Sequence, residues 1–201
     1  MKVTRSPGPR HWSRLPPILL LLLSAPGSAD WIVWDYDLRS CPPGWEFDPQ
    51  WEFSSEGVRM NEYVSTPYMT EWGDIFTGGV EIPSGCDSIV LHTGSYLTVH
   101  SSGNGFAGAR VHYRVNQGDW VELFGEGIWY ESAEPLHLRV PTVPCGLLEF
   151  HIEGYAGKGN DMYPGWGSID WLLHDLTLVF YGESVGLEGS TWGGAKVRSA
   201  G

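Results

Sequence analysis

Apolar and polar residues alternate with a period of two along most of this chain, and this alternation is what most constrains its fold. Between residues 109 and 115, apolar side chains alternate with Arg110, His112 and Arg114. The turn Asn116–Asp119 then leads into a second alternating segment, which is the pattern of a β-hairpin. No segment shows a sustained helical period. The 27 glycines and 14 prolines also favour strands and turns over long helices.

The alternation predicts nine or ten short strands separated by Gly/Pro turns. The run Ile169–Tyr181 is apolar enough to be a helix, but its β-branched and aromatic end favours a strand. The other expected strands are Trp31–Tyr36, Gly57–Met60, Ile75–Ile82, Ser88–His92, Tyr96–His100, Ala109–Val115, Trp120–Phe124, Leu136–Val140 and Leu148–Ile152. One face of each strand is apolar and the other polar. The predicted fold is therefore all-β, a two-sheet antiparallel β-sandwich (jelly roll).

The two ends of the chain differ from its middle. Residues 1–29 combine a basic start, a leucine-rich run of about nine residues and small residues at Gly27 and Ala29, the pattern of a secretory signal peptide. The run is too short to span a bilayer. Residues 182–201 are rich in Gly and Ser, which predicts a flexible C-terminal tail after a β-sandwich domain at 30–181. We therefore expect a secreted or cell-surface protein with no membrane insertion after signal cleavage.

The charge balance excludes some partners. The chain has 12 basic and 24 acidic residues, for a net charge of −12. Four of the basic residues lie in the signal segment, so residues 30–201 carry −16. A surface this acidic argues against binding nucleic acid or anionic lipid.

Three cysteines follow the signal segment. Cys86 and Cys145 each stand just before an expected strand, in similar Pro-containing contexts. An exported protein meets an oxidising environment, so we predict a Cys86–Cys145 disulfide and leave Cys41 free. The spacing of the three matches no zinc-ribbon pattern.

Three short segments resemble known bacterial sequences. Cys41–Phe47 resembles the early P-x-G-W segment of bacterial secreted jelly-roll modules of the choice-of-anchor and MAM-like type, and Trp51 stands where these modules have a second tryptophan. Their closing strand, W-x-I-D-D-[IV]-x-[LV], is similar to Gly165–Leu178, although Trp171 replaces the second Asp. The resemblance implies an adhesion or ligand-binding β-sandwich, often with a structural calcium. Gly189–Lys196 resembles short C-terminal TWG-x-x-K segments of secreted bacterial proteins, which are either attachment tags or disordered ends.

Aromatic residues near predicted turns form the first candidate site. Sugar rings have apolar C–H faces that stack on exposed aromatic side chains, so such residues favour carbohydrate binding. The alternative is that they cover the ends of the sandwich core. The candidate ligand-binding residues are Trp72, Trp120, Trp129, Tyr130, Tyr163 and Trp166.

Acidic residues form the second candidate site. Asp161, Asp170 and Asp175, with Asn160 in a Gly-rich loop, could supply oxygen ligands to calcium. Their spacing matches neither an EF-hand nor an RTX repeat. The alternative is that they are solvated acids at turns and strand ends.

A polar sheet face forms the third candidate. We expect eight side chains to point away from the core, and their histidines could bind zinc. Cross-strand pairing of Arg and Glu on an exposed face is the simpler interpretation. The eight are Arg110, His112, Arg114, His137, Arg139, Glu149, His151 and Glu153.

Support for catalysis is weak. The chain has no G-x-S-x-G or H-E-x-x-H motif. Glu149 and Glu153 share a face but stand about 13 Å apart along a strand, too far for a retaining carboxylate pair. We expect a non-catalytic module that binds a glycan or a cell-surface protein, with calcium as its expected ion. A structural or assembly module is the alternative, and a glycosidase-like enzyme is the third.

Overall fold

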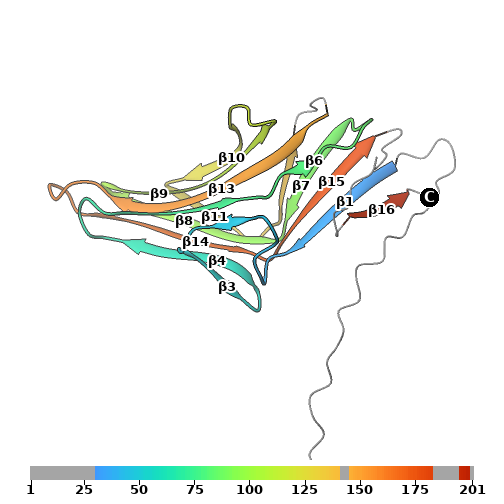
Figure 1. Ribbon diagram of the computed structural model, residues 1–201. Coiled ribbons are helices and arrows are strands. Elements are labelled where there is room, and N and C mark those ends of the chain that lie inside the picture. The colour runs from blue at the N-terminus through green and yellow to red at the C-terminus, as the bar shows by residue number, and fades with distance from the viewer. Residues whose placement is uncertain (1–29, 141–144, 183–194, 200–201) are drawn as a thin grey trace, which may run out of the picture.

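The alternating segments form strands in the structure. The computed structural model describes residues 30–140, 145–182 and 195–199, and within these ranges the chain forms sixteen β-strands and no helix (Figure 1). Nothing in these ranges is a helix of the length and apolarity needed to cross a membrane. The all-β class predicted from the alternation is confirmed.

The strands form three antiparallel sheets, each named here after one of its central strands. The β13 sheet has the order β10 (Val121–Gly127), β9 (Gly105–Val115), β13 (Leu147–Lys158), β5 (Thr70–Phe76) and β2 (Glu46–Phe47), and β6 (Val80–Glu81) also pairs with β13. The β14 sheet has the order β11 (Trp129–Ser132), β8 (Ser95–Gly103), β14 (Gly165–Leu173), β4 (Gly57–Val64) and β3 (Trp51–Ser54). The β15 sheet has the order β12 (Leu136–Val140), β7 (Ser88–Thr93), β15 (Asp175–Gly182), β1 (Asp30–Asp37) and β16 (Ala195–Ser199).

The β13 and β14 sheets are connected as a jelly roll. Strands β4, β14, β8 and β11 lie side by side in one sheet, and β5, β13, β9 and β10 lie side by side in the other. Along the chain, β4 to β5, β8 to β9, β10 to β11 and β13 to β14 each cross between the sheets, whereas β9 and β10 form a hairpin within one. Such interleaved antiparallel connections define a double-sheet jelly roll, as predicted.

The β15 sheet continues from the β14 sheet through a bend. Strand β7 leads into β8 at Gly94, and β14 leads into β15 at His174. At the bend the His174 amide donates to the Gly94 carbonyl at 2.8 Å, and the Gly94 amide donates to the Asp175 carboxylate at 2.8 Å. These bonds satisfy backbone groups that the change of direction would otherwise leave unpaired.

A single hydrophobic core lies between the sheets. Strand β13 sends Leu148, Phe150 and Ile152 into it, each at most 1% exposed, and Trp171 of β14 and Phe180 of β15 are fully buried in the same cluster. Burying a side chain of this size contributes about 1.5–3 kcal/mol. The residues between them on β13 point to the opposite side of the sheet, which is the polar face predicted from the alternation.

Two expected strands differ from those observed. Ile75–Ile82 is not one strand: β5 ends at Phe76, and β6 begins at Val80. Between them the buried Thr77 hydroxyl accepts a hydrogen bond from the Phe150 amide at 2.8 Å, and two glycines follow. Ile169–Tyr181 is also two strands, because the bend at His174 divides it. The local alternation of apolar and polar residues cannot predict either break, because both depend on hydrogen bonds to residues elsewhere in the chain.

The C-terminal segment differs too. No strand was predicted after Tyr181, yet Ala195–Ser199 forms β16 and pairs with β1, with Trp31 opposite Arg198 and Val33 opposite Lys196. Without β16, strand β1 would be an edge with unpaired N–H and C=O groups, and pairing satisfies them. Gly182 of the predicted tail ends β15, whereas the predicted signal peptide (residues 1–29) and residues 183–194 and 200–201 of the tail lie outside the described residues.

Candidate functional site

The outer face of the β13 sheet carries a row of charged residues that are paired across strands. On β13, Glu149, His151 and Glu153 alternate with the core residues and lie opposite Arg114, His112 and Arg110 of β9, respectively. Such directly opposed pairs stabilise a sheet. The Arg–Glu pairing expected from the sequence is present. In Figure 1, β9 and β13 curve along their length, and this face lies on the inner side of the curve.

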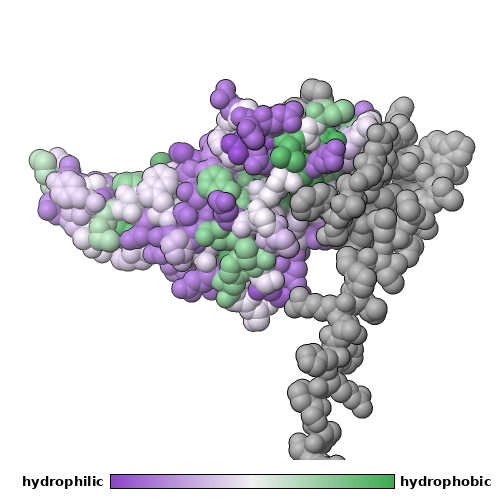
Figure 2. All heavy atoms as spheres, in the orientation of Figure 1, coloured by the Kyte–Doolittle hydropathy of each residue, from purple (hydrophilic) through white to green (hydrophobic). Residues whose placement is uncertain are grey.

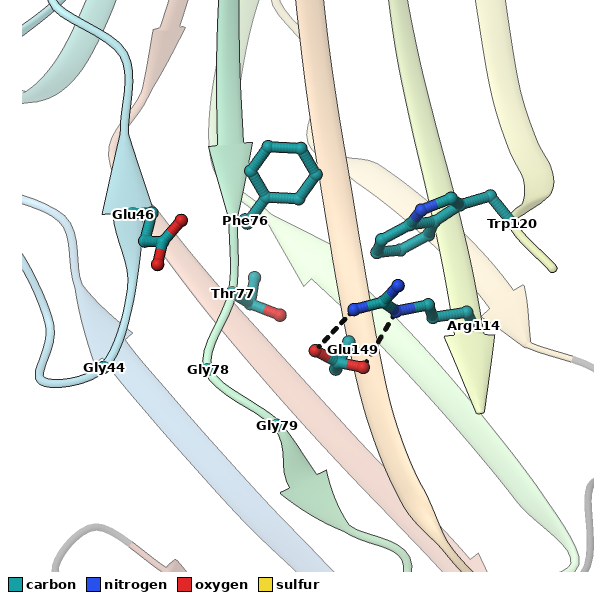
Figure 3. A pocket seen from close by; sticks show the side chains of 9 residues that line it. All are labelled: Gly44, Glu46, Phe76, Thr77, Gly78, Gly79, Arg114, Trp120 and Glu149. Atoms are coloured by element: carbon teal, nitrogen blue, oxygen red, sulfur yellow. Dashed lines mark hydrogen bonds and ion pairs between the residues drawn. The ribbon is translucent and has the colours of Figure 1, made fainter. Parts of the chain in front are cut away.

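A pocket of about 350 Å³ opens at one end of this face, beside the break between β5 and β6 (Figure 3). The Arg114 guanidinium makes two hydrogen bonds to the Glu149 carboxylate, at 2.9 and 3.1 Å, and lies 4.4 Å from the centre of the Trp120 ring. The hydrogen bonds to Glu149 raise the pKa of Arg114, so the guanidinium stays charged. The pocket is lined by Glu46, Phe76, Thr77, Arg114, Trp120 and Glu149, and by Gly44, Gly78 and Gly79.

The glycines of this break allow close packing around the pocket. A Cβ at Gly79 would lie 2.6 Å from the Leu147 side chain, and one at Gly78 would lie 3.2 Å from the Gly44 carbonyl oxygen. A side chain at Gly79 would therefore force the loop away from β13, and one at Gly78 would crowd Gly44.

Aromatic and imidazole rings occupy the middle of the face. His151 stacks on Phe76, with ring centres 4.4 Å apart and planes 9° apart, and its Nε2 lies 2.7 Å from the Asp74 carboxylate. Trp120 and His112 each lie 5.5 Å from the His151 ring. Burial, and then the neighbouring His151, lowers the pKa of His112.

A second aromatic surface lies at the far end of the face. Trp72, 45% exposed, stacks on Tyr155 at 4.8 Å with the planes 29° apart. The Arg110 guanidinium lies 5.4 Å from the Tyr155 ring centre. Trp72 and Phe76 stand four residues apart on β5, so this surface and the pocket are separated by about 13 Å.

The six aromatic candidates from the sequence are divided between two faces. Trp72 and Trp120 lie on the outer face of the β13 sheet, as described above. Trp129 stacks on His100 at 4.0 Å, and Trp166 stacks on Tyr63 at 5.7 Å, both on the outer face of the β14 sheet.

The other two aromatic candidates lie elsewhere. Tyr130 packs against the core near Phe124, and Tyr163 is exposed in the loop between β13 and β14. The structure therefore brings together two of the six predicted residues on the face with the pocket.

The three predicted calcium ligands lie in three places. Asp170 pairs with Arg59 on the outer face of the β14 sheet, and Asp175 accepts the Gly94 amide at the bend. Asp161 is exposed in the loop after β13. Calcium binding by these residues stays a prediction.

The cysteines are free thiols in the structure. Cys86 is half-buried, its thiol donates to the Ser88 carbonyl at 3.4 Å, and burial raises its pKa. Cys41 and Cys145 are exposed. The predicted Cys86–Cys145 bond is not formed here. Mass spectrometry of the purified protein, alkylated before and after reduction, would test it.

Several residues of this face were not singled out from the sequence. Tyr155 continues the alternation of Glu149, His151 and Glu153, so extending the predicted strand past Ile152 would have found it. Asp74 and Phe76 come from β5, and no pattern in the sequence sets the register of β5 against β13.

Comparisons with known proteins give structural likenesses only. A scan against protein-family models and a search of curated proteins return no match. The similar solved structures include one described as "CBM4 structure and function" (12% identity, 79% of this chain and 96% of that chain, TM-score 0.29). Another is TmCBM61 in complex with β-1,4-galactotriose (13%, 71% and 86%, TM-score 0.27). A third is the N-terminal cellulose-binding domain of Cellulomonas fimi β-1,4-glucanase C (14%, 83% and 99%, TM-score 0.31). The strand order described above, rather than these likenesses, defines the fold as a jelly-roll sandwich.

Proposed function

We propose that this protein is a non-catalytic carbohydrate-binding module that binds a neutral glycan on the outer face of the β13 sheet. The observation that carries the proposal is the pairing of two aromatic surfaces with a polar pocket on one curved face. Aromatic rings stack on the C–H faces of sugars, and a few placed polar groups fix orientation.

The pocket supplies the polar contacts. Arg114 and Glu149 hold each other in a fixed geometry, which leaves their outer lone pair and N–H positions for sugar hydroxyls. Trp120 and Phe76, whose ring centres lie 6.1 Å apart, provide apolar walls beside this pair (Figure 3). The net charge of −12 disfavours anionic glycans, so the expected ligand is neutral.

The surface of Trp72 and Tyr155 supplies the second contact. Its exposed indole can accept a sugar ring lying flat on the sheet. A glycan that reaches from this surface to the pocket crosses His151 and His112, so the ligand is a short chain rather than a single sugar.

The test is affinity electrophoresis of the protein through gels containing soluble neutral β-glucans, galactans or xylans, followed by calorimetry on the glycan that retards it. Trp72→Ala and Trp120→Ala should lose retardation, whereas Trp129→Ala and Trp166→Ala on the other face serve as matched controls and should keep it. Absence of retardation by every neutral glycan, or loss only in the two control variants, contradicts the proposal. An absence of all retardation would favour the structural or assembly alternative.

A further inference from the structure

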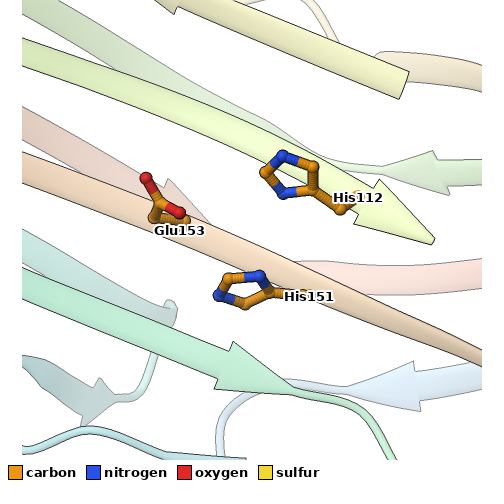
Figure 4. A group of neighbouring side chains, drawn as sticks. All are labelled: His112, His151 and Glu153. Carbon is orange, nitrogen blue, oxygen red and sulfur yellow. The ribbon is translucent and has the colours of Figure 1, made fainter. Parts of the chain in front are cut away.

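Two histidines and a glutamate converge in the middle of the β13 sheet's outer face. His112, His151 and Glu153 each offer one ligand atom, and these atoms lie within 4.8 Å of one another. Figure 4 shows the two imidazoles on neighbouring strands, each with a ring nitrogen turned toward the other ring, and the Glu153 carboxylate beside them. Among the described residues, no other group of three or more His, Cys, Asp or Glu side chains meets this condition.

The tautomer of His151 is set by Asp74. Its Nε2 lies 2.7 Å from the Asp74 carboxylate, which as an acceptor takes a hydrogen bond from the protonated Nε2–H. The lone pair of the neutral ring is then on Nδ1, the nitrogen that faces the cluster. A carboxylate behind a histidine in this way orients metal-binding imidazoles and raises their basicity.

The other two members carry buried atoms without a hydrogen-bond partner, although Nη1 of Arg110 lies 3.7 Å from Glu153 Oε1. His112 Nδ1 and Glu153 Oε1 are both inaccessible to solvent and make no hydrogen bond. Their side chains are only 16% and 12% exposed. Buried polar atoms in folded proteins are nearly always satisfied, so two adjacent exceptions call for a group that would bind both.

The surrounding charges favour a cation. Four carboxylates surround the rings, those of Asp74, Glu122, Glu149 and Glu153, against the two guanidiniums of Arg110 and Arg114. Glu122 lies 3.7 Å from His112 Nε2, on the side of the ring away from Nδ1. At this distance Glu122 adds negative charge beside His112 without a hydrogen bond to it.

We propose that His112, His151 and Glu153 bind a zinc ion, with the fourth coordination position open on the outer face. Two imidazole nitrogens and one carboxylate oxygen suit zinc, whereas calcium takes six to eight oxygens. Zinc–nitrogen bonds of about 2.0–2.1 Å require tetrahedral ligand atoms about 3.3 Å apart, so side-chain rotations close the cluster onto the ion. The observations behind this proposal do not depend on carbohydrate binding, although the open position faces the path of the proposed glycan.

The test is titration of the metal-free full chain with zinc, by calorimetry and by competition with a chromophoric chelator. We expect one zinc per chain, and a Co²⁺ substitute should show the visible absorption of a four-coordinate site. His112→Gln, His151→Gln and Glu153→Gln should each abolish this binding. Asp74→Asn should weaken it about 10–100-fold, since it removes the group that orients His151.

Two control variants report on other histidines. His100→Gln on the β14 sheet and His137→Gln, which removes the exposed His92–His137 contact, should bind zinc as the parent does. Melting temperature and far-ultraviolet dichroism without metal separate loss of ligands from loss of fold. The proposal is overturned if zinc does not bind, if His112→Gln and Glu153→Gln retain full binding, or if His137→Gln alone abolishes it.

Discussion

The outer faces of the β13 and β14 sheets both display aromatic side chains, yet they are built differently. On the β13 sheet, Trp72 and Trp120 stand among paired charges and beside a pocket. On the β14 sheet, Trp129 and Trp166 stack on His100 and Tyr63, and the nearby ion pair is Arg59 with Asp170. Exposed aromatic residues alone therefore do not define a ligand site. On the β13 sheet the rings stand beside a pocket that holds the Arg114–Glu149 pair.

The space-filling view shows one side of the molecule. In Figure 2 hydrophilic and hydrophobic residues are intermixed over this visible side, rather than gathered in one broad apolar patch. A broad apolar patch would mark a protein–protein contact.

The largest expected effect is on glycan affinity. Trp120→Ala should weaken binding at least tenfold, about 1.4 kcal/mol, because it removes both a stacking surface and a wall of the pocket. Trp129→Ala should change it less than twofold. Calorimetry measures the glycan affinity of both variants. An equal loss of affinity in the two would show that the glycan does not prefer the β13 face.

A smaller effect is expected from the pocket's ion pair. Glu149→Gln keeps the shape but removes the charge that holds Arg114, so we expect about a fivefold loss of glycan affinity, near 1 kcal/mol. Glu131→Gln on β11 is the matched control. Unchanged affinity in Glu149→Gln would show that the pocket does not contact the ligand.

A pH-dependent effect is expected from the β14 sheet. Burial, and then the neighbouring Glu71 and Glu52, raises the pKa of Glu62 above its ordinary value of 4.5. The folded state thus holds this proton more tightly than the unfolded state, and stability is lost as the pH rises from 4.5 through the raised pKa. Glu62→Gln should therefore raise the melting temperature at pH 7 and leave it unchanged at pH 3.5. A lower melting temperature at pH 7 would contradict the assignment.

The smallest effect is expected at the exposed ion pair of the β14 sheet. Arg59→Gln removes the partner of Asp170, and pairs with this exposure contribute about 0.5 kcal/mol. The melting temperature should fall by less than about 2 °C, and glycan affinity should not change. A decrease of several degrees would mean that this ion pair contributes more to stability than its solvent exposure predicts.

The sequence predicted the fold better than the site. Alternation around Val111, Leu138 and Phe150 identified strands and their buried sides, because burial of one face is a local property of each strand. The breaks at Thr77 and His174 were not predicted, since each depends on hydrogen bonds to distant residues. Strand β16 was not predicted for the same reason. It forms by backbone pairing with β1, which requires no alternation of apolar and polar residues in its sequence.

For the site, the charged row of β9 and β13 was predicted, but the grouping of the aromatic residues was not. Trp72 and Trp129 look alike in sequence, each close to a turn. Sheet register alone places one beside Tyr155 and the other beside His100. Asp74 could not be predicted because its role depends on its contact with His151 of the neighbouring strand.

Strand β13 also fixes the spacing of the side chains that face a ligand. Its outward residues Glu149, His151, Glu153 and Tyr155 follow one another at every second position, about 6.6 Å apart. The opposite face of this strand is packed in the core, so its backbone cannot stretch. The order and spacing of the carboxylate, imidazole, carboxylate and phenol groups are therefore fixed. Substitutions at these four positions would change the functional group at each position without changing the spacing between positions. This strand is therefore a natural starting point for engineering altered ligand selectivity.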